Sequence, residues 1–198
     1  KCKEYIAKGD AYQLCLTNQI VIETNNDPFA TFLKLRKSNP APYTSYIRLG
    51  KSALVSSSPE QFLKVSNGVV STKPIKGTRP RGTDVETDRV LAEELRSNEK
   101  ERAENLMIVD LLRNDLGRVA IPGSVTVDTL FEVEAYPTVH QMTSTVSARL
   151  ATQSLNDMIR SLFPCGSVTG APKVAAMQKI GAWEAAPRGL YTGTIGWA

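Results

Sequence analysis

Cysteine is scarce in this chain of 198 residues, and its scarcity argues against two classes of protein. The three cysteines, Cys2, Cys15 and Cys165, are scattered and include no Cys-x-x-Cys pair, so they indicate neither a disulfide framework nor a zinc site. Isolated free thiols are typical of the reducing cytosol. We therefore expect a cytoplasmic protein, in which Cys165 is a small buried apolar residue.

Long apolar runs are also missing. The longest stretches, such as Leu106–Val109, fall far short of the roughly 20 residues that a membrane helix needs. No charged segment followed by an apolar one stands at the N-terminus, so we expect no signal sequence. These two observations predict a protein with no membrane role.

Charge of one sign is not in large excess either. The chain has 24 lysines and arginines against 20 aspartates and glutamates, for a net charge of +4. Such a mild excess does not indicate a nucleic-acid-binding domain, and we expect no nucleic-acid partner. A small anionic substrate would account for the balance equally well.

What the chain does contain is enough apolar sequence, 41%, to form a real core, and we expect residues 1–198 to form a single domain. Periodicity and turn residues predict a mixed α/β fold without repeats. A helix is expected to end near Gly9, and further helices are expected over 27–37, 83–97, 100–114, 156–162 and 169–181. Strands are expected over 12–17, 20–23, 43–49, 53–56, 62–66, 69–72, 119–127, 139–148 and 193–197. Because the last of these strands is cut by the chain end, we expect the chain to be a fragment.

The segment Pro74–Gly82 places Lys76 in a turn fixed by two prolines and two glycines, between a strand and a basic loop. Such a lysine can be aimed at a target, and it becomes a nucleophile if burial or neighbouring cations lower its pKa. Lys73, Arg79 and Arg81 are neighbours of the required sign. The same residues are also compatible with a solvated basic hairpin loop.

Two acids, Glu101 and Glu104, are three residues apart on a predicted helix and so share one face. Paired carboxylates can bind Mg²⁺, which prefers oxygen ligands and completes its shell with water or substrate. The alternative is an ordinary solvated helix face, because the surrounding sequence is rich in charge.

Other candidate residues allow both a functional and a structural interpretation. The segment Gly166–Lys173 could offer backbone N–H groups to an anion, or Thr169 could simply cap the following helix. His140 could be a buried structural histidine, and Tyr191 could lie at the edge of the core. Glu60 could be a surface acid that follows a proline.

The motifs occur in one order along the chain. They are Ser57–Phe62, Pro74–Gly82, Lys100–Gly117, Tyr136–Met142, Cys165–Lys173 and Arg188–Gly193. Together they closely resemble the chorismate-utilising enzymes, the family of anthranilate, aminodeoxychorismate, isochorismate and salicylate synthases. The resemblance covers essentially all 198 residues. Compared with the family pattern, the chain lacks a long amino-terminal region and roughly the last quarter of the catalytic core.

The resemblance implies an α/β (α+β) fold, in which two stacked, mostly antiparallel sheets are flanked by helices, incomplete here, with the site in a cleft between lobes. It implies that Glu104 binds Mg²⁺, with Glu101 nearby, and that a partner glutamate comes from a carboxy-terminal helix absent from this chain. It implies chorismate as the substrate. The implied substrate-binding residues are Thr78, His140, Gly166, Ser167 and Tyr191.

The segment around Asn39 resembles part of a tryptophan pocket, which is a feedback site in anthranilate synthases and a structural site in some aminodeoxychorismate synthases. The pocket candidates are Pro42, Tyr43 and Thr44. The amino-terminal half of that pocket is absent from the chain, so tryptophan is a possible rather than a required ligand.

Two positions separate the branches of the family. Lys76 matches the Pro-Ile-Lys-Gly-Thr of aminodeoxychorismate synthases, whereas anthranilate synthases usually have alanine there. Isochorismate and salicylate synthases place a water-activating lysine where this chain has Gln13, and glutamine cannot act as that base. The resemblance therefore favours the synthase component of the aminodeoxychorismate synthase branch, which acts in p-aminobenzoate and folate synthesis.

In that branch the resemblance implies that Lys76 attacks chorismate C2 as the C4 hydroxyl leaves, with Glu60 as general acid, and that ammonia then adds at C4. The chain has no glutaminase signature, so ammonia would come from a glutamine amidotransferase, either a subunit or a fused domain. Two alternatives stay open. One is component I of anthranilate synthase, and the other is a catalytically silent fragment that binds small anions or a partner subunit.

Overall fold

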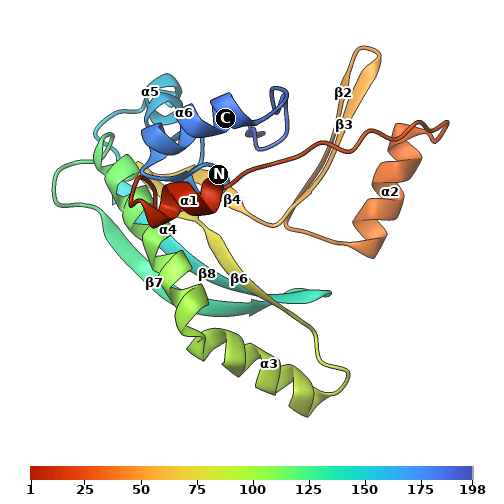
Figure 1. Ribbon diagram of the computed structural model, residues 1–198, viewed down its shortest axis with the longest axis horizontal. Helices are drawn as coiled ribbons and strands as arrows, with labels where there is room; N and C mark the ends of the chain where they lie inside the picture. Colours follow the sequence, from red (N-terminus) through yellow and green to blue (C-terminus); the bar gives the residue numbers. More distant parts are fainter. Residues whose placement is uncertain (198) are drawn as a thin grey trace.

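Strand β8 (Val139–Arg149) is the centre of the fold, because three other strands pair with it. In the computed structural model, which describes residues 1–197, β8 pairs antiparallel with β5 (Val69–Lys73) over one half of its length and with β6 (Ile75–Pro80) over the other. Strand β7 (Thr126–Ala135) follows its opposite edge, and β4 (Gln61–Ser66) extends the sheet beyond β5. The five strands form one antiparallel sheet (Figure 1).

The core lies between one face of this sheet and the helices. Alternate residues of β8, from His140 to Ala148, are buried, as expected for a strand with one face covered. Val146 and Ala148 pack in one cluster with Val109 of α4 (Glu99–Gly117) and Leu162 of α5 (Leu155–Leu162). Apolar burial over this face is therefore the main stabilising contribution.

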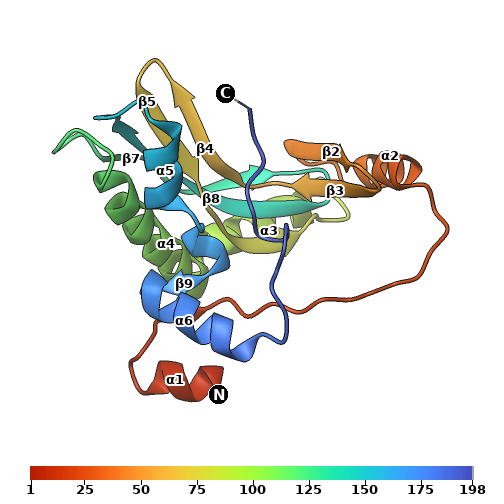
Figure 2. The same ribbon diagram turned by 90° about the horizontal axis from the view of Figure 1, so that it is seen from above.

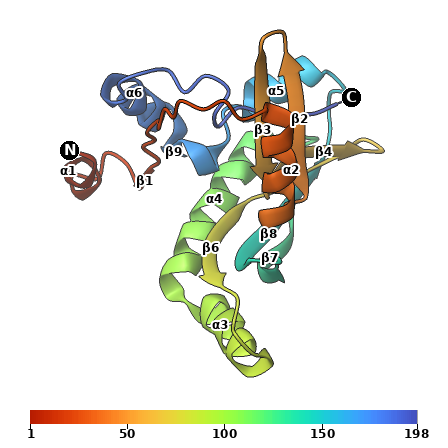
Figure 3. The same cartoon turned by 90° about the vertical axis from the view of Figure 1, so that its right-hand side faces the viewer.

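Helix α3 (Val85–Ser97) and α4 are joined directly at Asn98, which ends one helix and caps the other. The side chain of Asp84 accepts from the amides of Glu86 and Thr87, and the Thr87 hydroxyl accepts in return from the amide of Asp84, which makes a capping box at the start of α3. The Asn98 side chain accepts from the amide of Glu101. Asn98 thus marks the point where the chain turns from α3 into α4, and both helices contact β6 and β8 (Figure 3).

A hairpin of β2 (Tyr43–Leu49) and β3 (Ser52–Ser58) forms a separate two-stranded sheet. Helix α2 (Pro28–Ser38) packs on this hairpin through Phe29 and Phe32, whose rings lie 5.2 and 5.6 Å from that of Tyr46. An extended segment leads to α2 from the body of the protein and crosses open space (Figure 2).

A segment from the early part of the sequence pairs with one from the late part beside α4. Strand β1 (Gln13–Leu14) pairs with β9 (Gly170–Ala171), which follows the short 3₁₀ turn η1 (Gly166–Val168) and precedes α6 (Lys173–Trp183). Helix α1 (Cys2–Ala7) contacts α6 through the edge-to-face rings of Tyr5 and Trp183, 5.8 Å apart. Residues distant in sequence are thus brought together around η1.

The predicted mixed α/β class with antiparallel sheets is confirmed, whereas several predicted elements are wrong. Residues 20–23 and 193–197 form no strand, and of residues 12–17 only Gln13–Leu14 do. The side chains of Ile20, Val21 and Ile22 are 76–84% exposed, because no described strand lies beside them to cover this apolar run. The strand expected over 119–127 is β7, which starts at Thr126, and α6 starts at Lys173 rather than at Thr169.

The segment expected to be a turn around Lys76 is instead strand β6, with an irregularity in its register between Ile75 and Thr78. Gly77, with φ of +97°, lies at this irregularity. The glycine and prolines therefore shape an edge strand rather than a hairpin loop. Within the described residues no helix has the length and apolar character needed to cross a membrane.

Gly170 is required by the close approach of β1. Its φ is +149°, and a Cβ there would lie 2.2 Å from the carbonyl oxygen of Gln13 and 2.9 Å from the Cβ of Ala176. We expect Gly170→Ala to lower the free energy of unfolding by about 1–3 kcal/mol through strain and overpacking. Gly181→Ala is the matched control in α6. It meets nothing within 4 Å and should raise stability by about 0.5 kcal/mol. Urea unfolding of both variants tests this, and equal effects would contradict it.

Candidate active site

The structure brings Lys76 of β6 together with Ser167 of η1. The Nζ atom of Lys76 donates to the backbone carbonyl oxygen of Ser167 at 3.1 Å, and both side chains are at least partly buried. Turn η1 is held there because Gly166 lies directly against α4. A Cβ on Gly166 would be 2.4 Å from a methyl group of Leu111. The absence of a side chain at Gly166 therefore lets the turn approach the helix.

Glu60, between β3 and β4, completes this cluster. Burial raises the pKa of Glu60 above its ordinary value. The Ser167 hydroxyl, the Lys76 cation and the Ile75 backbone each lower it, but together they offset the effect of burial only in part. Its Oε1 atom is buried and has no hydrogen-bond partner among the described residues. A carboxyl group in this setting keeps its proton to a higher pH than a surface acid does, so the interpretation of Glu60 as a surface acid is wrong.

Cys165 adjoins the same cluster. Its Sγ atom lies 3.2 Å from the Ser167 hydroxyl, and burial together with the nearby Glu60 carboxylate raises the pKa of the Cys165 thiol. A neutral thiol behaves as a small apolar side chain with a weak donor, close to the expectation from the sequence. Cys165 is therefore not an activated nucleophile.

The loop amides expected to be available to an anion are partly used within the turn. The amides of Val168 and Thr169 donate to the carbonyl oxygens of Cys165 and Gly166 at 3.2 and 3.3 Å. The Thr169 hydroxyl donates to the Cys165 carbonyl at 3.0 Å, so Thr169 does not cap α6; the N-cap position is held by Pro172. The helix-cap interpretation of Thr169 is wrong.

The two carboxylates expected to bind metal are one turn apart on α4. Glu101 is mostly buried; its side chain accepts from Arg79 at 3.3 Å and lies against Gly77, where a Cβ would be 3.1 Å from that of Glu101. Glu104 is half-exposed and pairs with Lys100 at 3.4 Å. Among residues 1–197 no group of three His, Cys, Asp or Glu side chains gathers to hold a metal. The donors fit Mg²⁺ only as a two-carboxylate site that leaves positions for other oxygens.

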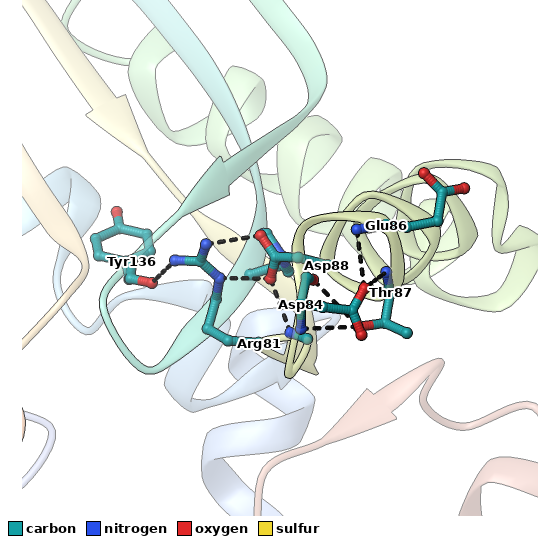
Figure 4. A network of polar contacts seen from close by, with 8 residues as sticks. Arg81, Asp84, Glu86, Thr87, Asp88 and Tyr136 are labelled. Carbon is teal, nitrogen blue, oxygen red and sulfur yellow. Dashed lines mark hydrogen bonds and ion pairs between the residues drawn. The ribbon is translucent and has the colours of Figure 1, made fainter.

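His140 is buried and is part of a network that the sequence did not predict. Its Nε2 atom lies 2.8 Å from Oδ1 of Asp88, while its Nδ1 atom is buried without a partner in the described part of the chain. Asp88 of α3 also accepts from the Arg81 guanidinium at 2.7 and 2.6 Å and from the amide of Gly82 at 2.8 Å (Figure 4). The Arg81 fork holds the pKa of Asp88 well below its ordinary range.

Tyr191 and Thr78 are not brought to Lys76 by any contact in residues 1–197. Tyr191 is 64% exposed and lines a groove between α6 and the following loop, together with Met177 and Arg188. Thr78 is exposed, and its carbonyl oxygen accepts from Arg79 at 2.8 Å. The substrate-binding roles of both residues remain predictions.

Arg188 is a residue that sequence reasoning missed. Its guanidinium donates to the carbonyl oxygens of Val168 and Cys15 at 2.5 and 2.6 Å and to the carboxylate of Glu184. It therefore ties η1 to the residue that follows β1. Its position in the motif Arg188–Gly193 was the available signal, although the motif alone does not reveal which carbonyl groups it contacts.

The candidates for a tryptophan pocket lie at the base of the β2–β3 hairpin. Pro42 and Thr44 line a surface hollow together with Phe32 and Arg36. The Tyr43 hydroxyl instead donates to the side chain of Gln61 at 3.0 Å. Binding of tryptophan remains a prediction.

Gln13, the position that separates the branches, lies in β1 opposite Ala171. Its side-chain oxygen Oε1 is buried and has no partner among residues 1–197. An amide without a partner in the protein has a free acceptor, but it has no proton-accepting ability comparable to that of a lysine amine.

Comparison with known proteins shows which family the sequence matches. A family described as chorismate binding enzyme matches residues 1–198. The aminodeoxychorismate synthase of Streptomyces griseus is 50% identical over 198 residues, covering 99% of this chain and 27% of that protein. Aminodeoxychorismate synthase component 1 of Salmonella typhimurium is 47% identical over 195 residues, covering 98% of this chain and 43% of that protein.

A solved structure of a related enzyme has a similar fold. Anthranilate synthase component I of Streptococcus pneumoniae matches with a TM-score of 0.82 and 37% identity, covering 92% of this chain and 40% of that one. The chain therefore belongs to the family of chorismate binding enzymes. It spans less than half the length of each of these three relatives.

The raised pKa of Glu60 makes stability depend on pH in a definite direction. An unfolded glutamate loses its proton near its ordinary pKa of 4.5, whereas the folded one holds its proton to higher pH. Between these values the folded state binds more protons, so the free energy of unfolding falls as pH rises through the folded pKa.

We expect Glu60→Gln to remove this decline, because a neutral amide cannot ionise. The variant should gain on the wild type above the folded pKa, by about 1.4 kcal/mol for each unit by which that pKa is raised. Urea unfolding from about pH 4 to pH 9 measures the difference. Parallel curves for the two proteins would show that Glu60 is not desolvated.

Proposed function

We propose that this chain carries the chorismate-aminating centre of an aminodeoxychorismate synthase component, with Lys76 as the covalent nucleophile. The observation that supports the proposal best is the cluster in which the Lys76 amine contacts η1 and a buried carboxyl group, Glu60, lies beside it. An amine and a proton-holding acid are the two groups that displacement of a hydroxyl group requires.

The proposed reaction has two displacements. The neutral Lys76 amine attacks C2 of chorismate, the ring double bonds shift, and the C4–O bond breaks as the hydroxyl accepts a proton and leaves as water. Ammonia then attacks C4, the double bonds shift back, and the C2–N bond to Lys76 breaks to release the lysine. The net change is replacement of the C4 hydroxyl by an amino group, with one water released.

Glu60 is the proposed proton donor to the departing hydroxyl. Its raised pKa supports this role, because a higher pKa increases the fraction of the carboxyl group that holds a proton to donate. The contact between the Lys76 amine and the Ser167 carbonyl supports the nucleophile's role, because it limits the directions in which the amine can point. The Gly166–Ser167 turn is the proposed substrate-binding edge.

Mg²⁺ is the proposed cofactor, held in this chain by Glu104 and Glu101. When bound, it would supply positive charge that orients a substrate carboxylate. For Glu101 to serve as a ligand, its ion pair with Arg79 must open or be shared. Arg79 retains a second partner, Glu94, which would keep its charge compensated.

Ammonia is proposed to come from a glutamine amidotransferase, as a subunit or a fused domain. The chain's one histidine contacts Asp88 rather than a thiol, so residues 1–197 hold no cysteine–histidine pair that could release ammonia from glutamine. The corresponding biological role would be an early step of p-aminobenzoate and folate synthesis.

Anthranilate synthesis is the second candidate, favoured by the likeness to the solved anthranilate synthase component. In that reaction ammonia itself attacks C2, and no lysine adduct forms. Whether a covalent adduct forms on Lys76 therefore distinguishes the two candidate functions.

The deciding measurement is the intact mass of the protein, expressed from its complete gene, after incubation with chorismate and Mg²⁺ without ammonia. We expect a mass increase of one chorismate less one water, mapped to Lys76 by peptide analysis and lost in Lys76→Ala. Lys73→Ala is the matched control, since Lys73 is a neighbouring lysine that pairs with Glu134, and it should keep the adduct. Absence of an adduct, with anthranilate formed on addition of ammonia, would transfer the assignment to the anthranilate branch.

The metal assignment has a separate test. Glu104→Gln should raise the Mg²⁺ concentration needed for half-maximal activity at least about tenfold, the equivalent of ~1.4 kcal/mol in binding. Glu99→Gln, an exposed acid at the start of the same helix, should leave it unchanged. Equal Mg²⁺ requirements in all three proteins would exclude Glu104 as a ligand.

A further inference from the structure

The Asp88–His140 contact has a chemical consequence beyond the roles assigned above. Asp88 is engaged by four donors: the Arg81 Nε and Nη2 atoms, the amide of Gly82 and the His140 ring. Arg81 keeps the carboxylate ionised, and an ionised carboxylate only accepts hydrogen bonds. The His140 Nε2 atom, 2.8 Å away, must therefore carry a proton.

The other ring nitrogen is then determined. In a neutral imidazole with a proton on Nε2, the Nδ1 atom holds a lone pair and accepts hydrogen bonds. Nδ1 is buried without a partner, and His140 as a whole is only 3% exposed. Buried polar atoms are rarely left unpaired, so this acceptor calls for a donor that residues 1–197 do not provide.

We propose that Asp88 is a positioning residue that holds His140 as its Nε2–H tautomer, so that Nδ1 accepts a hydrogen bond from a hydroxyl group of the substrate. This inference rests on the proposed function for the identity of the substrate. Arg81 supports His140 indirectly, through Asp88. Its guanidinium donates to the Asp88 carboxylate and to the carbonyl oxygen of Tyr136, the latter at 2.7 Å, and so fixes that carboxylate in place.

The geometry around Asp88 favours this role over a purely structural ion pair. Gly82 packs so closely on the first turns of α3 that a Cβ would be 2.1 Å from the amide nitrogen of Asp88, which fixes the loop and the helix together. His140 lies on β8 opposite Arg79 of β6, the strand that also carries Lys76. The positioned ring thus belongs to the same pair of strands as the proposed nucleophile.

Nitrogen NMR of histidine-labelled protein reads the tautomer directly, with His140→Gln used to assign the resonances. In the wild-type protein we expect neutral His140 to carry its proton on Nε2, and chorismate to shift the Nδ1 resonance. If the Nδ1 resonance already has the chemical shift of a hydrogen-bonded acceptor without chorismate, and chorismate does not change it at the same pH, water supplies the donor. That result would overturn the substrate contact. An Nδ1–H tautomer in the wild type would overturn the whole inference.

Asp88→Asn supplies the second test, because an amide can donate as well as accept and no longer imposes one tautomer. We expect the Nδ1–H form to become populated and kcat to fall about 10- to 100-fold, with KM changed less. This fall in kcat is smaller than the ~10²–10⁴-fold that a complete acid–base group contributes. Glu93→Gln, which breaks an exposed ion pair with Arg96 on the same helix, should change neither quantity.

An unchanged tautomer together with an unchanged kcat in Asp88→Asn would show that Asp88 serves only the fold. These results are separable from those on Lys76. The tautomer is measured without turnover, and the mass adduct at Lys76 can form or fail whichever nitrogen of His140 holds the proton.

Discussion

The carbonyl oxygen of Ser167 accepts a hydrogen bond from Lys76, and this contact joins two segments that are 91 residues apart. Its effect depends on packing, because η1 can reach β6 only where Gly166 leaves room beside Leu111. Arg188 holds the same turn from the other side through the carbonyl of Val168. The position of the amine, the turn and the buried carboxyl group of Glu60 are thus set by one another.

Two carboxyl groups of the protein, Glu60 and Asp88, have surroundings that shift their pKa values in opposite directions. Burial raises the pKa of Glu60, whereas the Arg81 fork lowers that of Asp88. One group is suited to give a proton and the other to remain a fixed negative charge.

Much of this could be predicted from local sequence, because helix caps and apolar alternation are local signals. The α3 and α4 helices and strand β8 follow from Asp84, Asn98 and the buried alternation after Val139. The exposed run Ile20–Ile22 looked like a strand because periodicity cannot show whether a partner strand exists. Lys76 and Glu60 were found from motifs, but the contacts of Asp88 with His140 and of Arg188 with Cys15 depend on tertiary approach that no spacing encodes.

The pairing of β1 with β9 has a consequence for the order of folding. The contacts that accompany it join residues very far apart in the chain, 167 residues for Thr17 with Glu184 and 173 for Cys15 with Arg188. Closing such long loops costs entropy before any contact compensates for it, and long-range contacts slow folding. The sheet around β8 can assemble first, so the surroundings of η1 are expected to form last and to open first when the protein fluctuates. The Gly166–Ser167 turn, proposed to bind the substrate, is then also the part of the site that opens and re-forms most often.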